Sequence, residues 1–171
     1  YTFLFEQINV MINIIGHAGS GTHLIIDNRV HAFSNKNAIS ILKNSQINVY
    51  HDKIEKVIRI KKMSERYDHK IIGKIDLHLP FNTNLRGVIK NSDLTISKVR
   101  GTIAIKTEST DSDLNNLNGN IIISTRGGNI SATKLSGEME LNVVSGDINI
   151  FDCDANSMLT MDNGNIFING L

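Results

Sequence analysis

The sequence is poor in several residue types that often support a fold or a function. A single cysteine, Cys153, excludes an intrachain disulfide and cannot build a zinc site by itself. The chain has one proline, no tryptophan and only 5 % aromatic residues. This composition disfavours a sugar-binding groove lined with aromatic rings, and it is unusual for an enzyme of this length.

The sequence also has no large excess of charge of either sign: it contains 18 basic and 17 acidic side chains, for a formal net charge of +1. We therefore expect no nucleic-acid partner, because binding to a phosphate backbone depends on a basic excess that releases counterions. The longest apolar stretch, residues 8–15, is interrupted by asparagine. It is shorter than the roughly 20 residues that span a bilayer. We expect membrane association only through partners or through an export signal removed before Tyr1.

What the sequence has instead is an 18-residue repeat in its second half. Glycines recur at this interval at Gly101, Gly119 and Gly137, where each repeat begins, and we expect them to be turn residues. Apolar residues recur in matching columns, with Ile105, Ile123, Leu141 and Leu159 in one and Ile130, Ile148 and Ile166 in another. Apolar positions alternate with polar ones, as in β-strands that have one buried face. The pattern predicts two short strands per repeat and a core built from these ladders of side chains.

A second set of glycines marks turns between the two strands of a repeat. Gly128, Gly146 and Gly164 occupy the tenth position, and Asp or Asn follows this position in every repeat. Glycine and Asp or Asn tolerate a positive φ, so the pair predicts a tight turn. The earlier repeats have Ser92 and Thr110 in place of the glycine, which makes their turns less regular.

A repeat of this kind cannot bury its apolar face alone, so neighbouring repeats must stack about 4.8 Å apart. We therefore predict an all-β fold, a single-stranded parallel β-helix (β-solenoid) with 18-residue rungs. Residues 81–171 would form about five rungs. Residues 1–80 lack a clear register but contain alternating runs, such as Ile39–Ile41, and turn-like segments, such as Ser34–Asn37. We expect an irregular β-rich N-terminal half, continuous with the solenoid, whose strand Ile75–Leu79 leads into it before Pro80.

Three short motifs resemble those of a known family. They are Ser145-Gly146-Asp147-Ile148, the rung start Gly119-Asn120-Ile121, and the lead-in Ile75–Pro80. The family is a group of bacterial envelope-associated domains of unknown function that are provisionally named adhesins. The resemblance covers residues 75–171. It implies a β-solenoid in an exported protein of the bacterial cell envelope or surface, and it implies no catalytic residues.

The stacked acidic turns are the sharpest candidate site. Asp93, Asp111 and Asp147 could offer oxygen ligands to calcium, which takes about six to eight of them. We favour the alternative that these side chains form a turn ladder and accept hydrogen bonds from neighbouring backbone amides. The calcium-binding repeat GGxGxD is absent from the sequence. We predict neither a metal nor a cofactor.

Glu108, Asp111 and Asp113 could act as the carboxylate pair of a glycosidase. They share one polar segment without aromatic neighbours, so we expect a solvated turn and no catalytic residues. The six histidines all lie in the first half and form no metal-binding motif: His17, His23, His31, His51, His69 and His78. Cys153 lies in an apolar column, which predicts a buried and unreactive thiol.

The leading interpretation is a non-enzymatic structural or adhesion-type module of a bacterial envelope or surface protein. The alternative is a subunit of a large multi-protein envelope assembly, such as a secretion system. A third hypothesis is a carbohydrate-active β-helix enzyme. The repeat runs to Leu171 without a polar cap, which predicts protein partners at the ends or edges of the solenoid.

Overall fold

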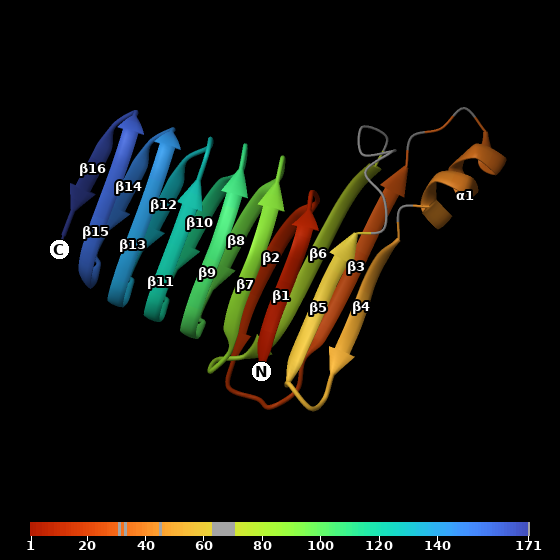
Figure 1. Ribbon diagram of the computed structural model, residues 1–171, viewed down its shortest axis with the longest axis horizontal. Coiled ribbons are helices and arrows are strands. Elements are labelled where there is room, and N and C mark those ends of the chain that lie inside the picture. The colour runs from red at the N-terminus through yellow and green to blue at the C-terminus, as the bar shows by residue number, and fades with distance from the viewer. Residues whose placement is uncertain (31, 33, 45, 63–70, 171) are drawn as a thin grey trace.

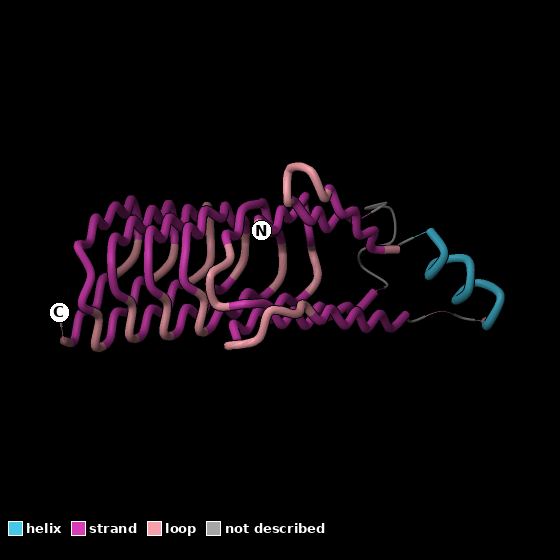
Figure 2. The backbone as a smooth tube through the Cα atoms, turned by 90° about the horizontal axis from the view of Figure 1, so that it is seen from below, coloured by secondary structure: helices cyan, strands magenta, loops and turns pink. Residues whose placement is uncertain are grey.

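The chain folds into two facing β-sheets of eight strands each (Figures 1 and 2). The computed structural model describes residues 1–30, 32, 34–44, 46–62 and 71–170. Sheet A has the strand order β15-β13-β11-β9-β7-β1-β5-β4, and sheet B has the order β16-β14-β12-β10-β8-β2-β6-β3. Within the described part of the chain, no helix has the length and apolar character needed to cross a bilayer.

The second half of the chain is the predicted parallel β-solenoid. Each rung contributes one strand to each sheet, and neighbouring rungs pair at an interval of 18 residues, as in Ile105↔Ile123↔Leu141. The sheet A strands are β7 (Asn84–Lys90), β9 (Arg100–Glu108), β11 (Asn118–Thr125), β13 (Ser136–Ser145) and β15 (Asp154–Asn163). The sheet B strands are β8 (Asp93–Ser97), β10 (Asp111–Asn115), β12 (Ile130–Thr133), β14 (Ile148–Phe151) and β16 (Ile166–Asn169). The predicted fold class is confirmed.

The core lies between the two sheets and follows the predicted alternation. In β11 the residues Ile121, Ile123 and Thr125 are buried, whereas Ile122 and Ser124 between them are only half-buried. The opposite strand β12 buries Ile130 and Ala132. Because successive side chains of a strand point to opposite faces, a period of two is enough to build one continuous core.

The N-terminal strands belong to the same two sheets, but not in chain order. Strand β1 (Thr2–Ile8) lies between β7 and β5 (Val57–Lys62), and β2 (Met11–His17) lies between β8 and β6 (Ile71–Pro80). All these neighbours pair in parallel. The chain therefore starts in the middle of the stack, builds outward, and returns to continue in the other direction (Figure 1). Pro80 is the last residue of β6, where its missing N–H is tolerated.

Two antiparallel strands complete the sheets at this end. Strand β3 (His23–Val30) pairs with β6, and β4 (Ile47–Asp52) pairs with β5. They make this end irregular compared with the purely parallel rungs, in line with the predicted irregular β-rich half.

The expected strand at Ile39–Ile41 and the expected turn at Ser34–Asn37 are wrong in detail, because helix α1 spans Asn35–Asn44. The Ser34 side chain caps this helix: its Oγ accepts a hydrogen bond from the Asn37 backbone N–H at 3.3 Å. Ile41 is buried, while Ile39 is 55 % exposed. Ala38, Ile41 and Leu42 follow the i, i+3, i+4 spacing of a helical apolar face, which outweighs the two-residue spacing of the isoleucines.

Candidate functional site

The turns that lead from each sheet A strand to the following sheet B strand carry the Gly-Asx pairs and form one edge of the stack, which we call the turn edge. The residue that takes the positive φ differs between the earlier and the later rungs. Gly128, Gly146 and Gly164 adopt φ values of 108°, 137° and 136°. In the two earlier rungs, the positive φ moves one residue back to Asn91 and Ser109, both at 50°. The rungs that lack the turn glycine therefore make the same reversal with a left-handed residue just before Ser92 or Thr110.

The Asp and Asn side chains after these turns form a ladder of hydrogen bonds between rungs. Asp111 Oδ1 accepts from the Asn129 backbone N–H at 2.7 Å, Asn129 Oδ1 from Asp147 N–H at 2.9 Å, and Asp147 Oδ1 from Asn165 N–H at 2.8 Å. Asp93 stands first in this column, in register with Asp111. Among the described residues, no group of three or more His, Cys, Asp or Glu side chains is arranged to hold a metal ion. The geometry is that of the turn ladder, with carboxylates bound to backbone amides.

The second turn of each rung was not identified from the sequence. Its corner residues all adopt a left-handed φ of about 50–80°: Lys98, Asn116, Lys134, Asp152 and Gly170. They are 18 residues apart and are all exposed. Asparagine, aspartate and glycine in three of the five rungs are the signal that could have located this corner.

The three carboxylates considered as a glycosidase pair lie on different surfaces. Glu108 points outward from sheet A and forms an ion pair with Lys90 at 3.3 Å. Asp113 points outward from sheet B, and Asp111 lies at the turn edge in the ladder. Between residues 108 and 113 the chain passes from sheet A to sheet B around the core. Residues close in sequence therefore lie on different faces and do not form a shared cleft.

The described histidines are also dispersed. His17 Nδ1 accepts a hydrogen bond from the Gly19 backbone N–H at 2.9 Å, and the His51 ring packs 5.7 Å from the Tyr1 ring. His23 and His78 are register partners on β3 and β6. His31 and His69 lie outside the described residues. Cys153 is buried, with its Sγ 3.4 Å from the Leu135 backbone nitrogen.

A shallow groove of about 530 Å³ crosses five rungs on the outer face of sheet A. One side contains the uncharged polar residues Ser124, Asn142 and Thr160, of which Ser124 and Thr160 are both register partners of Asn142. The other side carries charged residues, including Arg126 and Asp162, together with Val144. The groove therefore combines polar, charged and apolar side chains that repeat at the rung spacing. We call it the sheet A groove.

The predicted core ladders are continuous until the last rung. Ile105, Ile123 and Leu141 are buried in one, and Ile130 and Ile148 in the other. Leu159 is only half-buried and Ile166 is 42 % exposed, because no described strand stacks on β15 or β16 from outside. Leu171, the expected last member of a further apolar column, lies outside the described residues.

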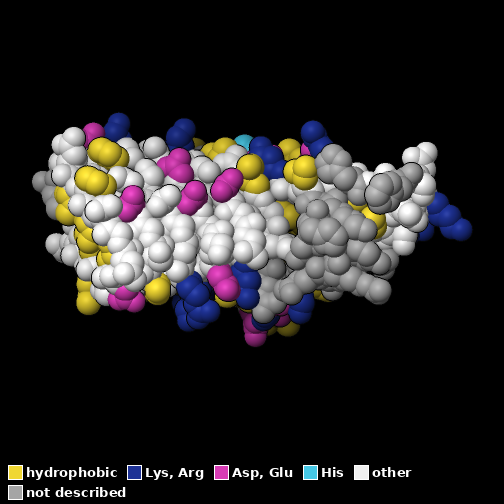
Figure 3. Space-filling view, turned by 90° about the horizontal axis from the view of Figure 1, so that it is seen from above, with side chains coloured by type: hydrophobic (Ala, Val, Ile, Leu, Met, Phe, Trp, Pro, Cys, Tyr) yellow, Lys and Arg dark blue, Asp and Glu magenta, His cyan; other side chains and the backbone are white. Residues whose placement is uncertain are grey.

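Of the glycines expected at turns, Gly128, Gly146 and Gly164 do lie at the turn edge. The expectation is wrong for Gly101, Gly119 and Gly137, which are the second residues of β9, β11 and β13 and stack on one another. Figure 3 views the turn edge. Uncharged surface covers its middle, with acidic side chains along one side of it.

Comparison with known protein families found no matching family model, and comparison with curated proteins found no matching sequence. Among solved structures, the fold is similar to that of a protein from Clostridium sporogenes ATCC 15579 that is provisionally described as a cell adhesion protein. The two chains are 9 % identical, with a TM-score of 0.60, and the alignment covers 99 % of this chain and 92 % of the other. At this identity the similarity establishes the fold alone.

Proposed function

We propose that this chain is a non-enzymatic β-solenoid module with an adhesion-type or structural role at a bacterial cell surface or envelope. The observation that carries the proposal is the sheet A groove, which crosses five rungs with side chains that repeat at the rung spacing. A long, shallow groove of this kind suits an extended ligand better than a small molecule, which binds in a concave pocket that encloses most of its surface.

Two further observations support a non-enzymatic role. The carboxylates Glu108, Asp111 and Asp113 are separated onto different surfaces, so they do not form an acid–base pair. The structurally similar protein from Clostridium sporogenes is provisionally described as a cell adhesion protein. The resemblance of residues 75–171 to envelope-associated adhesin-like domains points in the same direction.

The test is a binding experiment with purified chain on arrays of immobilised glycans and extracellular-matrix proteins. The variant Asn142→Lys places a bulky charge in the middle of the sheet A groove. The matched control Asn149→Lys changes the same residue type on the outer face of sheet B. Binding that Asn142→Lys abolishes and Asn149→Lys preserves would support the proposal. Binding to no surface, or equal loss in both variants, would contradict it.

The second candidate function is a subunit of a larger envelope assembly, and the exposed outer strands favour it. Strands β15 and β16 are the edge strands of the two sheets, and they expose Met158, Phe167 and Ile168. Exposed edge strands with apolar side chains pair readily with other chains. The native mass of the complex that carries this chain, extracted gently from source-cell envelopes, separates the two candidates. A mass far above 19.0 kDa with stoichiometric partners would favour the assembly subunit.

A further inference from the structure

Charge is segregated along the long axis of the molecule, although the net charge is near zero. Residues 135–171 contain six acidic side chains and no Lys, Arg or His. Residues 23–62, from β3 to β5, contain eight basic side chains and three acidic ones. These two segments occupy opposite ends of the stack, because β15 and β16 are outermost at one end and β4 and β3 at the other (Figure 1).

The end formed by β15 and β16 is acidic and partly apolar, and we call it the acidic end. Asp152 and Asp154 stand just before or at the start of β15, and Asp162 stands near its end; all three are exposed. Between them, Met158 is 63 % exposed and Phe167 on β16 is 56 % exposed. Both of these strands have one side that pairs with no described strand.

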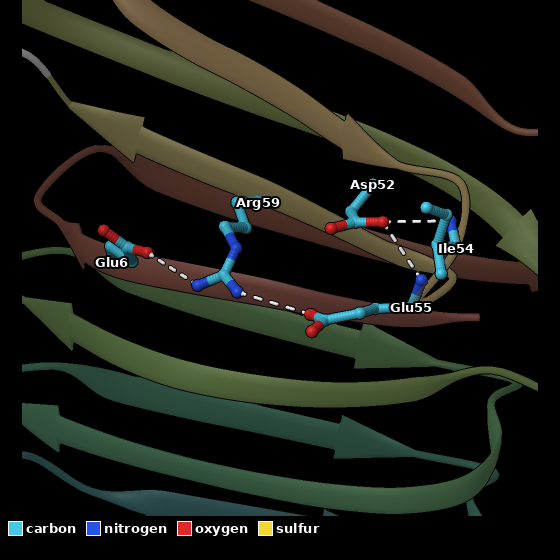
Figure 4. Close-up of polar contacts among 5 residues, drawn as sticks. All are labelled: Glu6, Asp52, Ile54, Glu55 and Arg59. Atoms are coloured by element: carbon cyan, nitrogen blue, oxygen red, sulfur yellow. Dashed lines mark hydrogen bonds and ion pairs between the residues drawn. The ribbon is translucent and has the colours of Figure 1, made fainter.

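The opposite end, formed by β3, β4 and α1, carries a basic surplus, and we call it the basic end. Some of its charge is neutralised, since Arg59 pairs with Glu6 at 3.6 Å and with Glu55 at 3.8 Å (Figure 4). Lys61 pairs with Glu6 at 3.4 Å. Within the described part of the chain, Lys36 and Lys43 on α1 and Lys53 and Lys56 in the β4–β5 turn form no ion pair, and all four are exposed. These four lysines carry the surplus.

The β4–β5 turn holds its lysines in a defined place. Asp52 Oδ1 accepts hydrogen bonds from the backbone N–H groups of Ile54 and Glu55, at 2.9 and 3.0 Å (Figure 4). This side-chain turn fixes the direction of the segment that carries Lys53. Strand β4, which leads into this turn, also exposes apolar side chains: Val49 is 44 % exposed and Tyr50 is 54 % exposed.

Strand direction places the charges of the two ends on matching edges. Strand β5 is linked to β15 through parallel neighbours only, so both strands start at the same edge of sheet A. Lys53 and Lys56 precede β5 at that edge, as Asp152 and Asp154 precede or open β15. At the other edge, α1 leads into the antiparallel strand β4, while Asp162 lies near the end of β15.

We propose that copies of this chain associate head to tail, with the acidic end of one copy against the basic end of the next. In this arrangement helix α1, which projects along the long axis beyond β3 and β4, lies between the two copies (Figures 1 and 2). The contact is heterologous, so it repeats along the axis instead of closing into a dimer. A contact between two acidic ends would place like charges together. Asp162 belongs to both the acidic end and the sheet A groove, whereas Asp152 and Asp154 lie at the acidic end alone.

Sedimentation velocity of the full chain tests the proposal. In about 20 mM salt we expect species larger than dimers, which dissociate towards monomer at about 500 mM salt, because screening weakens contacts between exposed charges. The acidic-end variant Asp152→Lys/Asp154→Lys, which leaves the sheet A groove unchanged, and the basic-end variant Lys36→Glu/Lys53→Glu should each sediment as monomers. The control Asp113→Lys changes an exposed carboxylate in the middle of sheet B and should assemble like the unmodified chain. Circular dichroism establishes that each variant is folded.

Mixing the two end variants gives the decisive result. The acidic-end variant keeps an unmodified basic end, and the basic-end variant keeps an unmodified acidic end, so an equimolar mixture should form dimers through these two ends. A mixture in which both variants stay monomeric would overturn the head-to-tail arrangement. Unmodified chain that stays monomeric in low salt, or assembles independently of salt and of the end variants, would also overturn it.

Discussion

The backbone N–H of Asn129 donates to Asp111 Oδ1 at 2.7 Å, across one rung of the solenoid. The next links of the same ladder use Asn129 Oδ1 and then Asp147 Oδ1 as acceptors. From Asp111 to Asn165 the ladder alternates carboxylate and amide, so no two adjacent members of these four are both charged. Asp111, Asn129 and Asp147 each satisfy a backbone donor at a turn, where the regular strand pairing is interrupted.

Replacing Asn129 separates two contributions of this ladder: the hydrogen bonds to backbone amides and the spacing of its charged side chains. Asn129→Ala removes the acceptor for the Asp147 N–H and should lower the free energy of unfolding by about 1 kcal/mol, measured by urea denaturation. Asn129→Asp keeps an acceptor but places a carboxylate between Asp111 and Asp147. We expect its loss of stability at neutral pH to diminish in high salt, whereas the loss in Asn129→Ala should not depend on salt. The same salt response in both variants would contradict the alternation argument.

The inward register of β12 predicts a sharp contrast between two adjacent residues. Ile130 is completely buried and its neighbour Ser131 is not. Ile130→Asn should lower the free energy of unfolding by about 3–5 kcal/mol, because it removes apolar packing and buries an amide without partners. Ser131→Asn adds the same side chain on the outer face and should change stability by less than about 0.5 kcal/mol. Chemical denaturation of both variants makes the comparison, and equal effects would refute the register.

Gly119 is a position where the stack leaves no room for a side chain. Its φ is 129°, and a Cβ there would clash with the carbonyl oxygen of Gly101 on the preceding rung. Gly119→Ala should therefore lower the free energy of unfolding by about 1–3 kcal/mol, visible as a lower melting temperature. Ala155 occupies the corresponding position two rungs later, in register with Gly137. Ala155→Gly is the control, and a loss as large as that of Gly119→Ala would contradict the steric explanation.

Asp76 connects the stability of the fold to pH. The hydrogen bond from Asn13 Nδ2, 3.0 Å away, lowers the pKa of the Asp76 carboxyl, and the nearby Lys74 ammonium at 3.0 Å adds to this, against a smaller opposing effect of burial. A carboxyl with a lowered folded-state pKa contributes stability above its unfolded pKa of about 4, and this contribution is lost as pH falls through the folded value. Asn13→Ala should thus destabilise the chain at pH 7 and make its acid unfolding less steep below pH 4.

The matched variant for this test is Asn149→Ala, which also changes an outward asparagine of sheet B but contacts no carboxylate among the described residues. Melting temperatures between pH 2 and pH 7 give the comparison. If the difference between Asn13→Ala and the unmodified chain stays constant over this range, the hydrogen bond does not act through the ionisation of Asp76.

The repeating half of this protein is predictable from local sequence, because every rung there repeats the same pattern of inward apolar residues and turn residues. Ile105, Ile123 and Leu141 mark the same inward position, and the Gly-Asx pairs mark the same turn, so the columns specify the register without further information. Helix α1 could also have been identified from the spacing of Ala38, Ile41 and Leu42, although two isoleucines in alternation favoured a strand.

How the first half joins the stack is visible only in the folded chain. The pairing of β1 with both β5 and β7 depends on contacts between residues far apart in sequence, which no local period can reveal. The separation of Glu108 from Asp113 likewise follows from the path of the chain around the core. The opposition of an acidic and a basic end has the same origin, since strand order, not chain order, decides which charges face outward at each end.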